Sequence, residues 1–159
     1  MNRIDFNKYN RILGISTGIL SFVVFALTVE PTASYWDCAE YISTSAKLQI
    51  GHPPGAPLFQ MLGAIFSIFA LELNQIAYAV NMMSVLSSAL TIVFLFWSIS
   101  LIGKEILGLT NSLKTDEAIK VFGSSFLGSI SFTFTDSFWF NAVEAEVYAM
   151  ATLILAILF

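Results

Sequence analysis

The sequence has little charge, one cysteine and one histidine, and these scarcities exclude several classes of protein. Charged residues make up 11% of the chain, whereas soluble domains carry about a quarter, so a soluble domain is excluded. The lone Cys38 excludes an intrachain disulfide and a metal cluster built on cysteines. The few basic residues form no patch suited to nucleic acid. We expect no nucleic-acid partner, no metal site and no cofactor.

Apolar residues are abundant instead. They make up 57% of the chain, and the mean hydropathy is +0.78. A helix needs about 20 mostly apolar residues to cross the hydrocarbon core of a bilayer. The sequence therefore predicts an all-α fold, a multi-pass transmembrane helical bundle. Its expected spans cover residues 12–29, 76–102, 121–135 and 147–159.

The first apolar run, residues 12–29, follows a basic N-terminus that contains Arg3, Lys8 and Arg11. Positive charge before a span favours a cytoplasmic N-terminus. The alternative is a cleaved signal peptide, although the run is long for one and residues 31–34 make a weak cleavage site. The sequence stops inside an apolar run, so we expect it to be the N-terminal part of a longer transmembrane domain.

Residues 58–71 are apolar but short for a span, which favours a helix lying at the membrane interface. If they crossed the bilayer, the loop with Lys104, Lys114 and Lys120 would lie outside and the acidic stretch 136–146 inside. Both placements oppose the tendency of positive charge to stay in the cytoplasm. The interfacial arrangement instead puts loops 30–75 and 136–146 together on the outer face.

Asp37 and Glu40 are three residues apart in a segment, residues 37–48, that reads as a short helix. That spacing puts both carboxylates on one helix face. A carboxylate held near a membrane surface can act as a base. The alternative is a pair of solvated acids, with Asp37 serving only to start the helix.

Residues 51–57 have the sequence GHPPGAP, which excludes a helix because proline removes a donor and restricts the residue before it. Such a stiff turn could aim the interfacial helix and hold His52 toward a polar site. A histidine there can donate to a phosphate or move a proton. The alternative is a purely structural break.

An acidic and aromatic stretch, residues 141–148, precedes the last apolar run. Glu144 and Glu146 cannot both face lipid, because acids near the hydrocarbon core are costly. If a helix begins near Asn141, Glu144 and Tyr148 share one of its faces. The alternative is that these acids only favour the positive end of a helix dipole, which explains one acid better than two.

Three motifs together resemble a known family: residues 36–41 (WDCAEY), 51–59 (GHPPGAPLF) and 142–148 (AVEAEVY). In this order they look like a bacterial membrane family, common in Bacteroidetes, that is similar to the protein O-mannosyltransferases of the GT-C superfamily. The resemblance implies a GT-C-like fold with interfacial helices in the first outer loop. It also implies a location in the bacterial inner membrane.

The resemblance implies an activity as well. GT-C enzymes take sugar from a lipid-phosphate donor on the non-cytoplasmic side, usually with a catalytic acid in the first outer loop. The expected reaction moves a sugar such as mannose from a polyprenyl phosphate to an exported protein, at Ser or Thr, or to a glycan. Asp37 would be the base and Glu40 its partner. The residues expected to bind substrate are His52, Glu144, Glu146 and Tyr148.

One departure from the family leaves the choice of base open. O-mannosyltransferases typically have adjacent Asp and Glu, whereas two residues separate Asp37 from Glu40 here. Lys47 and His52 are the only outer basic groups, so we expect the rest of the protein to supply another cation. Two alternatives to a transferase remain: a transporter or channel whose acids form an ion path, and a structural membrane scaffold.

Overall fold

The computed structural model describes residues 3–159 and is built almost entirely from helices, which confirms the all-α prediction. The helices are α1 (Phe6–Thr28), α2 (Cys38–Lys47), α3 (Pro57–Ser67), the 3-10 helix η1 (Leu73–Gln75), α4 (Ile76–Ile106), α5 (Thr115–Thr133), α6 (Asp136–Ala142) and α7 (Val147–Leu158). Two short strands, β1 (Ile4–Asp5) and β2 (Ser112–Leu113), pair antiparallel.

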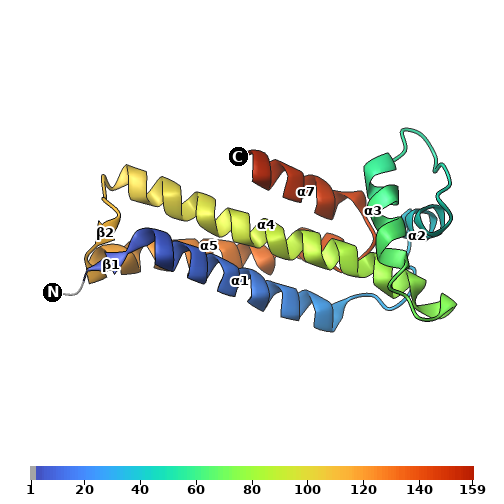
Figure 1. Ribbon diagram of the computed structural model, residues 1–159, viewed down its shortest axis with the longest axis horizontal. Helices are drawn as coiled ribbons and strands as arrows, with labels where there is room; N and C mark the ends of the chain where they lie inside the picture. The colour runs from blue at the N-terminus through green and yellow to red at the C-terminus, as the bar shows by residue number, and fades with distance from the viewer. Residues whose placement is uncertain (1–2) are drawn as a thin grey trace.

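Helix α4 is the centre of an elongated bundle, and α1, α5 and α7 pack along it (Figure 1). Glycines let α1 approach α4 closely, because a Cβ built on Gly18 would lie 2.2 Å from Val93 Cγ2. Hydroxyl groups join α1 to α5, since the Ser21 and Thr133 side chains are hydrogen-bonded at 3.1 Å. Small residues and hydroxyls of this kind are typical contacts between membrane helices.

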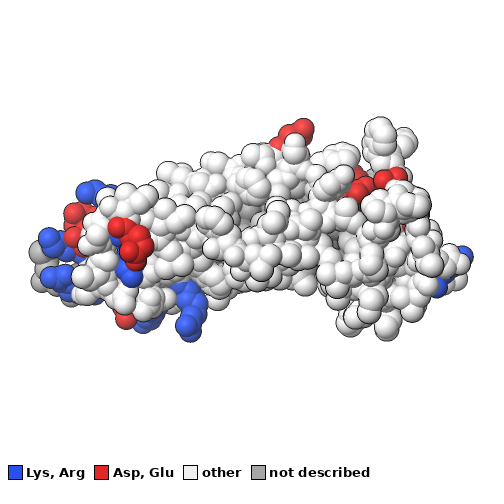
Figure 2. Space-filling view, turned by 90° about the horizontal axis from the view of Figure 1, so that it is seen from above, with Lys and Arg blue, Asp and Glu red and all other residues white. Residues whose placement is uncertain are grey.

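The two ends of the bundle differ in charge. One end holds the N-terminus, β1, β2 and the beginning of α5, and Figure 2 shows Lys and Arg gathered there. Six of the seven basic residues lie in or beside these elements, the first turns of α1 and the last turn of α4: Arg3, Lys8, Arg11, Lys104, Lys114 and Lys120. Lys47, in the last turn of α2, lies at the opposite end.

Helices α2 and α3 form the other end, where α3 runs crosswise to the long axes of α1 and α4 (Figure 1). Pro57 begins α3, at a position where its missing N–H costs nothing. Buried side chains tie α2 and α3 to α4 and α7, among them Cys38, Phe59, Val80 and Met150. This apolar cluster supports the segments that carry the acidic residues.

The polar segment between the expected spans 76–102 and 121–135 is helical at both of its ends, although a loop was expected there. Helix α4 continues to Ile106, and Gly108, with a φ of 60°, follows its end. Helix α5 begins at Thr115, where Glu117 accepts a hydrogen bond from the Lys114 backbone N–H at 2.8 Å. Such a cap stabilises a helix start that hydropathy alone does not reveal.

No helix begins near Asn141, so the condition under which Glu144 and Tyr148 would share a helix face is not met. The chain breaks between α6 and α7, and the two helices are bent by 108°. The Val143 carbonyl accepts a hydrogen bond from the Glu30 N–H at 3.0 Å, so a contact with a distant segment fixes the break. Glu144 therefore lies in the break, and it does not share a helix face with Tyr148.

By length and composition, two helical segments can cross a membrane: α1, and residues 73–106, which join η1 to α4. The bent pair α6 and α7 would be a third crossing if both helices form one broken span. Helix α5 contains residues 121–133 of the apolar run 121–135 and packs beside α1 and α4. Its crossing of the bilayer stays a prediction.

Candidate functional site

The first acidic residues lie at the start of α2. Asp37 directly precedes the helix, and Glu40 is in its first turn. The side chains of Asp37 and Glu40 are 56% and 35% exposed, so both reach solvent. The pair lies at the end of the bundle opposite the cluster of basic residues.

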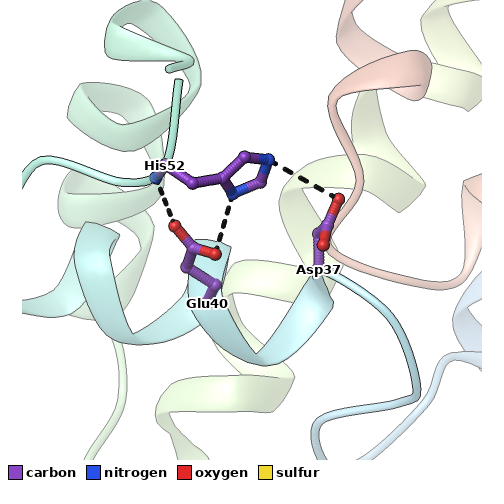
Figure 3. Close-up of side chains that lie close together, drawn as sticks. All are labelled: Asp37, Glu40 and His52. Atoms are coloured by element: carbon purple, nitrogen blue, oxygen red, sulfur yellow. Dashed lines mark hydrogen bonds and ion pairs between the residues drawn. The ribbon is translucent and has the colours of Figure 1, made fainter. Parts of the chain in front are cut away.

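The segment between α2 and α3 folds back over α2 and brings His52 to these acids (Figure 3). The Glu40 carboxylate accepts two hydrogen bonds from His52, one from its backbone N–H at 2.6 Å and one from Nδ1 at 2.8 Å. The other ring nitrogen, Nε2, lies 4.0 Å from Asp37 Oδ2. Gly51 makes room for this contact, because a Cβ there would lie 2.9 Å from Glu40 Oε1.

The contact between Glu40 and His52 shifts the pKa of both groups. The hydrogen bond from the His52 backbone N–H, followed by that from its side chain, lowers the pKa of Glu40 below its usual 4.5. The hydrogen bond to Glu40, the charge of Glu40 and then the charge of Asp37 raise the pKa of His52 above its usual 6.5. Each partner thus favours the charged form of the other.

The second acidic stretch meets the first at the same end of the bundle. Glu146 directly precedes α7, and burial, followed by the negative charges of Asp37 and Glu144, raises its pKa. Tyr41 of α2 lies among these groups, and its pKa is raised by burial and then by the charge of Glu146. The structure therefore places Asp37 and Glu146 in one neighbourhood.

Glu144 makes its side-chain contact with another segment and not with His52. It is 6% exposed, and its carboxylate accepts a hydrogen bond from the Ser34 hydroxyl at 2.5 Å. With Glu30 and Phe140 it borders a separate surface hollow of about 490 Å³. Tyr148 is 62% exposed in the first turn of α7. Of the residues expected to bind substrate, only His52 contacts the α2 acids directly.

Two residues that hold the site together were not singled out as site residues. Asn81 is fully buried on α4 and donates to the backbone carbonyls of Glu30 and Thr32. Ser34 fixes Glu144 in place. A buried amide near the start of a span is a signal that could have identified Asn81, whereas nothing distinguishes Ser34 in the sequence.

The structure also offers a geometry for a cation. One ligand atom each of Asp37, Glu40 and His52 can be chosen so that all three lie within 4.8 Å of one another. No metal site was expected from the sequence. Glu40 and His52 already satisfy one another through hydrogen bonds, so their arrangement does not require an ion.

These observations define a helical membrane protein with an acidic site at one end of its bundle. Residues 37–159 match the model of the family described as the protein O-mannosyl-transferase TMEM260 N-terminal domain. The chain belongs to this family, which confirms the resemblance to protein O-mannosyltransferases.

Two curated relatives are similar to the chain. A protein O-mannosyl-transferase tmem260 of Dictyostelium discoideum is 26% identical over 86% of this chain and 15% of its own length. A protein O-mannosyl-transferase TMEM260 of Mus musculus is 26% identical over 85% of this chain and 17% of its own length. The chain thus spans about one sixth of these relatives. No solved structure matches it.

Proposed function

We propose that the chain contributes the acidic site of a membrane glycosyltransferase. The enzyme moves a sugar, mannose, from a polyprenyl-phosphate donor to a hydroxyl group, that of Ser or Thr in an exported protein. The names of both relatives support the activity. The observation that carries the proposal is the position of Asp37, an open carboxylate at the end of the bundle opposite six basic residues.

Asp37 acts as the base. Its carboxylate takes the proton of the acceptor hydroxyl while the hydroxyl oxygen bonds to the anomeric carbon of the sugar. The bond from that carbon to the phosphate oxygen breaks, and the electron pair leaves with the polyprenyl phosphate. A positioned base contributes about 10²- to 10⁴-fold to such a rate.

The orientation follows from the charge of the two ends. The basic end, with the N-terminus, faces the cytoplasm, because basic residues are retained on that side. Asp37 and Glu146 then face the non-cytoplasmic compartment, and in a bacterium the membrane is the inner membrane. Helix α3 lies at the outer interface, in agreement with its crosswise course. An interfacial helix beside an outer acidic site resembles the first outer loop of GT-C enzymes.

The arrangement of acids does not favour a transporter. An ion path needs ionisable groups along the membrane interior. The apolar runs 12–28 and 76–102 contain no Asp or Glu, and the acids of the site gather at one end instead.

Replacement of Asp37 by Asn in the full-length protein tests the proposal. We expect sugar transfer from a polyprenyl-phosphate donor to fall by about 100-fold or more, because the amide cannot accept the proton. Glu72→Gln is the matched control, since Glu72 is exposed and lies outside the site. If the Asp37→Asn variant transferred sugar at the wild-type rate, Asp37 would not be the base.

A further inference from the structure

The two carboxylates on α2 differ in what they contact. Both oxygens of Glu40 are occupied, Oε1 by the His52 backbone N–H at 2.6 Å and Oε2 by its Nδ1 at 2.8 Å. Within residues 3–159, no group donates a hydrogen bond to the Asp37 side chain, whose nearest basic atom is His52 Nε2 at 4.0 Å. Glu40 is therefore engaged, whereas Asp37 is open to a substrate hydroxyl.

The two contacts fix the imidazole. One holds the backbone of residue 52 and the other holds the ring, so His52 cannot rotate without losing a charge-assisted hydrogen bond. Because an ionised carboxylate only accepts, Nδ1 must carry the proton in this contact. The ring then presents Nε2 to the space beside Asp37. The distance of 4.0 Å from Nε2 to Asp37 Oδ2 is too long for a direct hydrogen bond, so Nε2 remains available to a ligand.

The charge of this end adds a second argument. Asp37, Glu40, Glu144 and Glu146 are all acidic, and Glu146 responds to the charge of Asp37. Among the described residues, His52 is the only basic group within ion-pair distance of an acid. Lys47, in the last turn of α2, is the other basic residue at this end, but the His52 ring is the one that lies between the acids and can attract an anionic donor there.

We propose that Glu40 is a positioning residue, which holds His52 so that Nε2–H donates to the phosphate of the lipid-linked sugar beside Asp37. This inference rests on the proposed transferase function and assigns the two acids different roles. Asp37 takes the proton, and Glu40 acts only through His52. The carboxylates on both sides of the ring favour the imidazolium form, in which both nitrogens donate. The raised pKa of His52 agrees with this form.

The test is a double-mutant cycle in the full-length protein, with the steady-state kinetics of sugar transfer as readout. We expect Glu40→Gln and His52→Gln each to raise the donor KM or lower kcat by a total of about 10- to 100-fold, the range of one charge-assisted hydrogen bond. The acceptor KM should not change. Glu40→Gln should add nothing in the His52→Gln background, because the two residues act as a unit.

Inhibition by free polyprenyl phosphate gives a second readout that a purely structural role would not move. Both variants should weaken this inhibition by the same factor, whereas the control Glu72→Gln should leave it unchanged. Glu40→Asp keeps the charge but shortens the side chain by one methylene. Its inhibition constant for polyprenyl phosphate should therefore lie between those of the wild type and Glu40→Gln.

Additive losses in the double variant, or an unchanged donor kcat/KM and an unchanged inhibition constant in His52→Gln, would overturn this inference. Either result is compatible with transfer that still depends on Asp37. The proposed function fails differently, through Asp37→Asn that transfers sugar at the wild-type rate. The two sets of variants therefore separate the two ideas.

Discussion

The Asn81 side chain of α4 donates a hydrogen bond at 2.6 Å to the backbone carbonyl of Glu30, at the end of α1. The same amide donates to the Thr32 carbonyl at 3.0 Å, and its oxygen faces the Cys38 thiol at 3.9 Å. One buried side chain thus fixes the segment that leads from the first span to Asp37. The position of the candidate base depends on this contact.

Asn81→Leu should destabilise the protein, because it keeps a similar volume but leaves two part-buried carbonyls without a donor. We expect a loss of about 1–3 kcal/mol in the free energy of unfolding. Thermal unfolding of the full-length protein in detergent measures it, together with the rate of sugar transfer. Asn141→Ala is the control, since its exposed amide donates only to the Ser137 carbonyl one turn earlier. Equal Tm values for both variants would contradict the prediction.

Gly18→Ala should also destabilise the protein, since its Cβ would lie 2.2 Å from Val93 Cγ2 and 3.2 Å from the Ala89 carbonyl oxygen. Overpacking of this kind costs about 1–3 kcal/mol. Gly103→Ala is the matched control, because a Cβ at that helical position meets nothing within 4 Å. It should raise stability by about 0.5–1 kcal/mol. Tm values that fall equally in both variants would argue against close packing of α1 on α4.

Glu146→Gln should raise stability near neutral pH. Because the folded pKa of Glu146 lies above its ordinary 4.5, ionisation opposes folding. The stability from its protonated form is complete below the unfolded pKa and is lost as the pH rises through the folded pKa. The Tm of the wild type should therefore fall relative to Glu146→Gln as the pH rises from about 4 to about 7.

Glu72→Gln controls for the loss of one negative charge at the same end. Its Tm should follow that of the wild type over the whole pH range, since Glu72 is exposed. If Glu146→Gln also followed the wild type, burial beside Asp37 and Glu144 would not be the source of the pH dependence.

Cysteine labelling should reveal the orientation of the bundle. Tyr35 and Thr110 are exposed at opposite ends, and the natural Cys38 is buried. In intact cells, a membrane-impermeant maleimide should react with Tyr35→Cys in a protein lacking other reactive cysteines. It should react with Thr110→Cys only after the membrane is permeabilised. The reverse pattern would place the acidic end in the cytoplasm and contradict the proposed topology.

Local signals in the sequence predicted several parts of the site correctly. The short helix after Asp37 and the non-helical turn at residues 51–57 both follow from the placement of proline and glycine. The spacing of Asp37 and Glu40 predicted two neighbouring carboxylates, and His52 lies within 4.0 Å of both. These features depend on neighbouring residues, so a linear pattern reveals them.

The break between α6 and α7 did not follow from the sequence. Residues 143–146 have no proline or glycine, and the apolar pattern around them suits a helix. The contact of Glu30 with Val143 and that of Ser34 with Glu144 fix the break instead. Each joins residues more than 100 positions apart, and no local pattern encodes such a partner.

By itself, the sequence determined that the chain is helical, that its long apolar runs suit a bilayer, and that seven of its eleven acids lie in other polar segments than six of its seven basic residues. Only the tertiary structure decided that His52 engages both oxygens of Glu40 and leaves Asp37 open. The physical reason is that hydrophobicity and helix propensity act locally. The partner of a side chain depends instead on the tertiary packing. Helix α3 packs against α2, and the connecting residues 48–56 therefore return to α2.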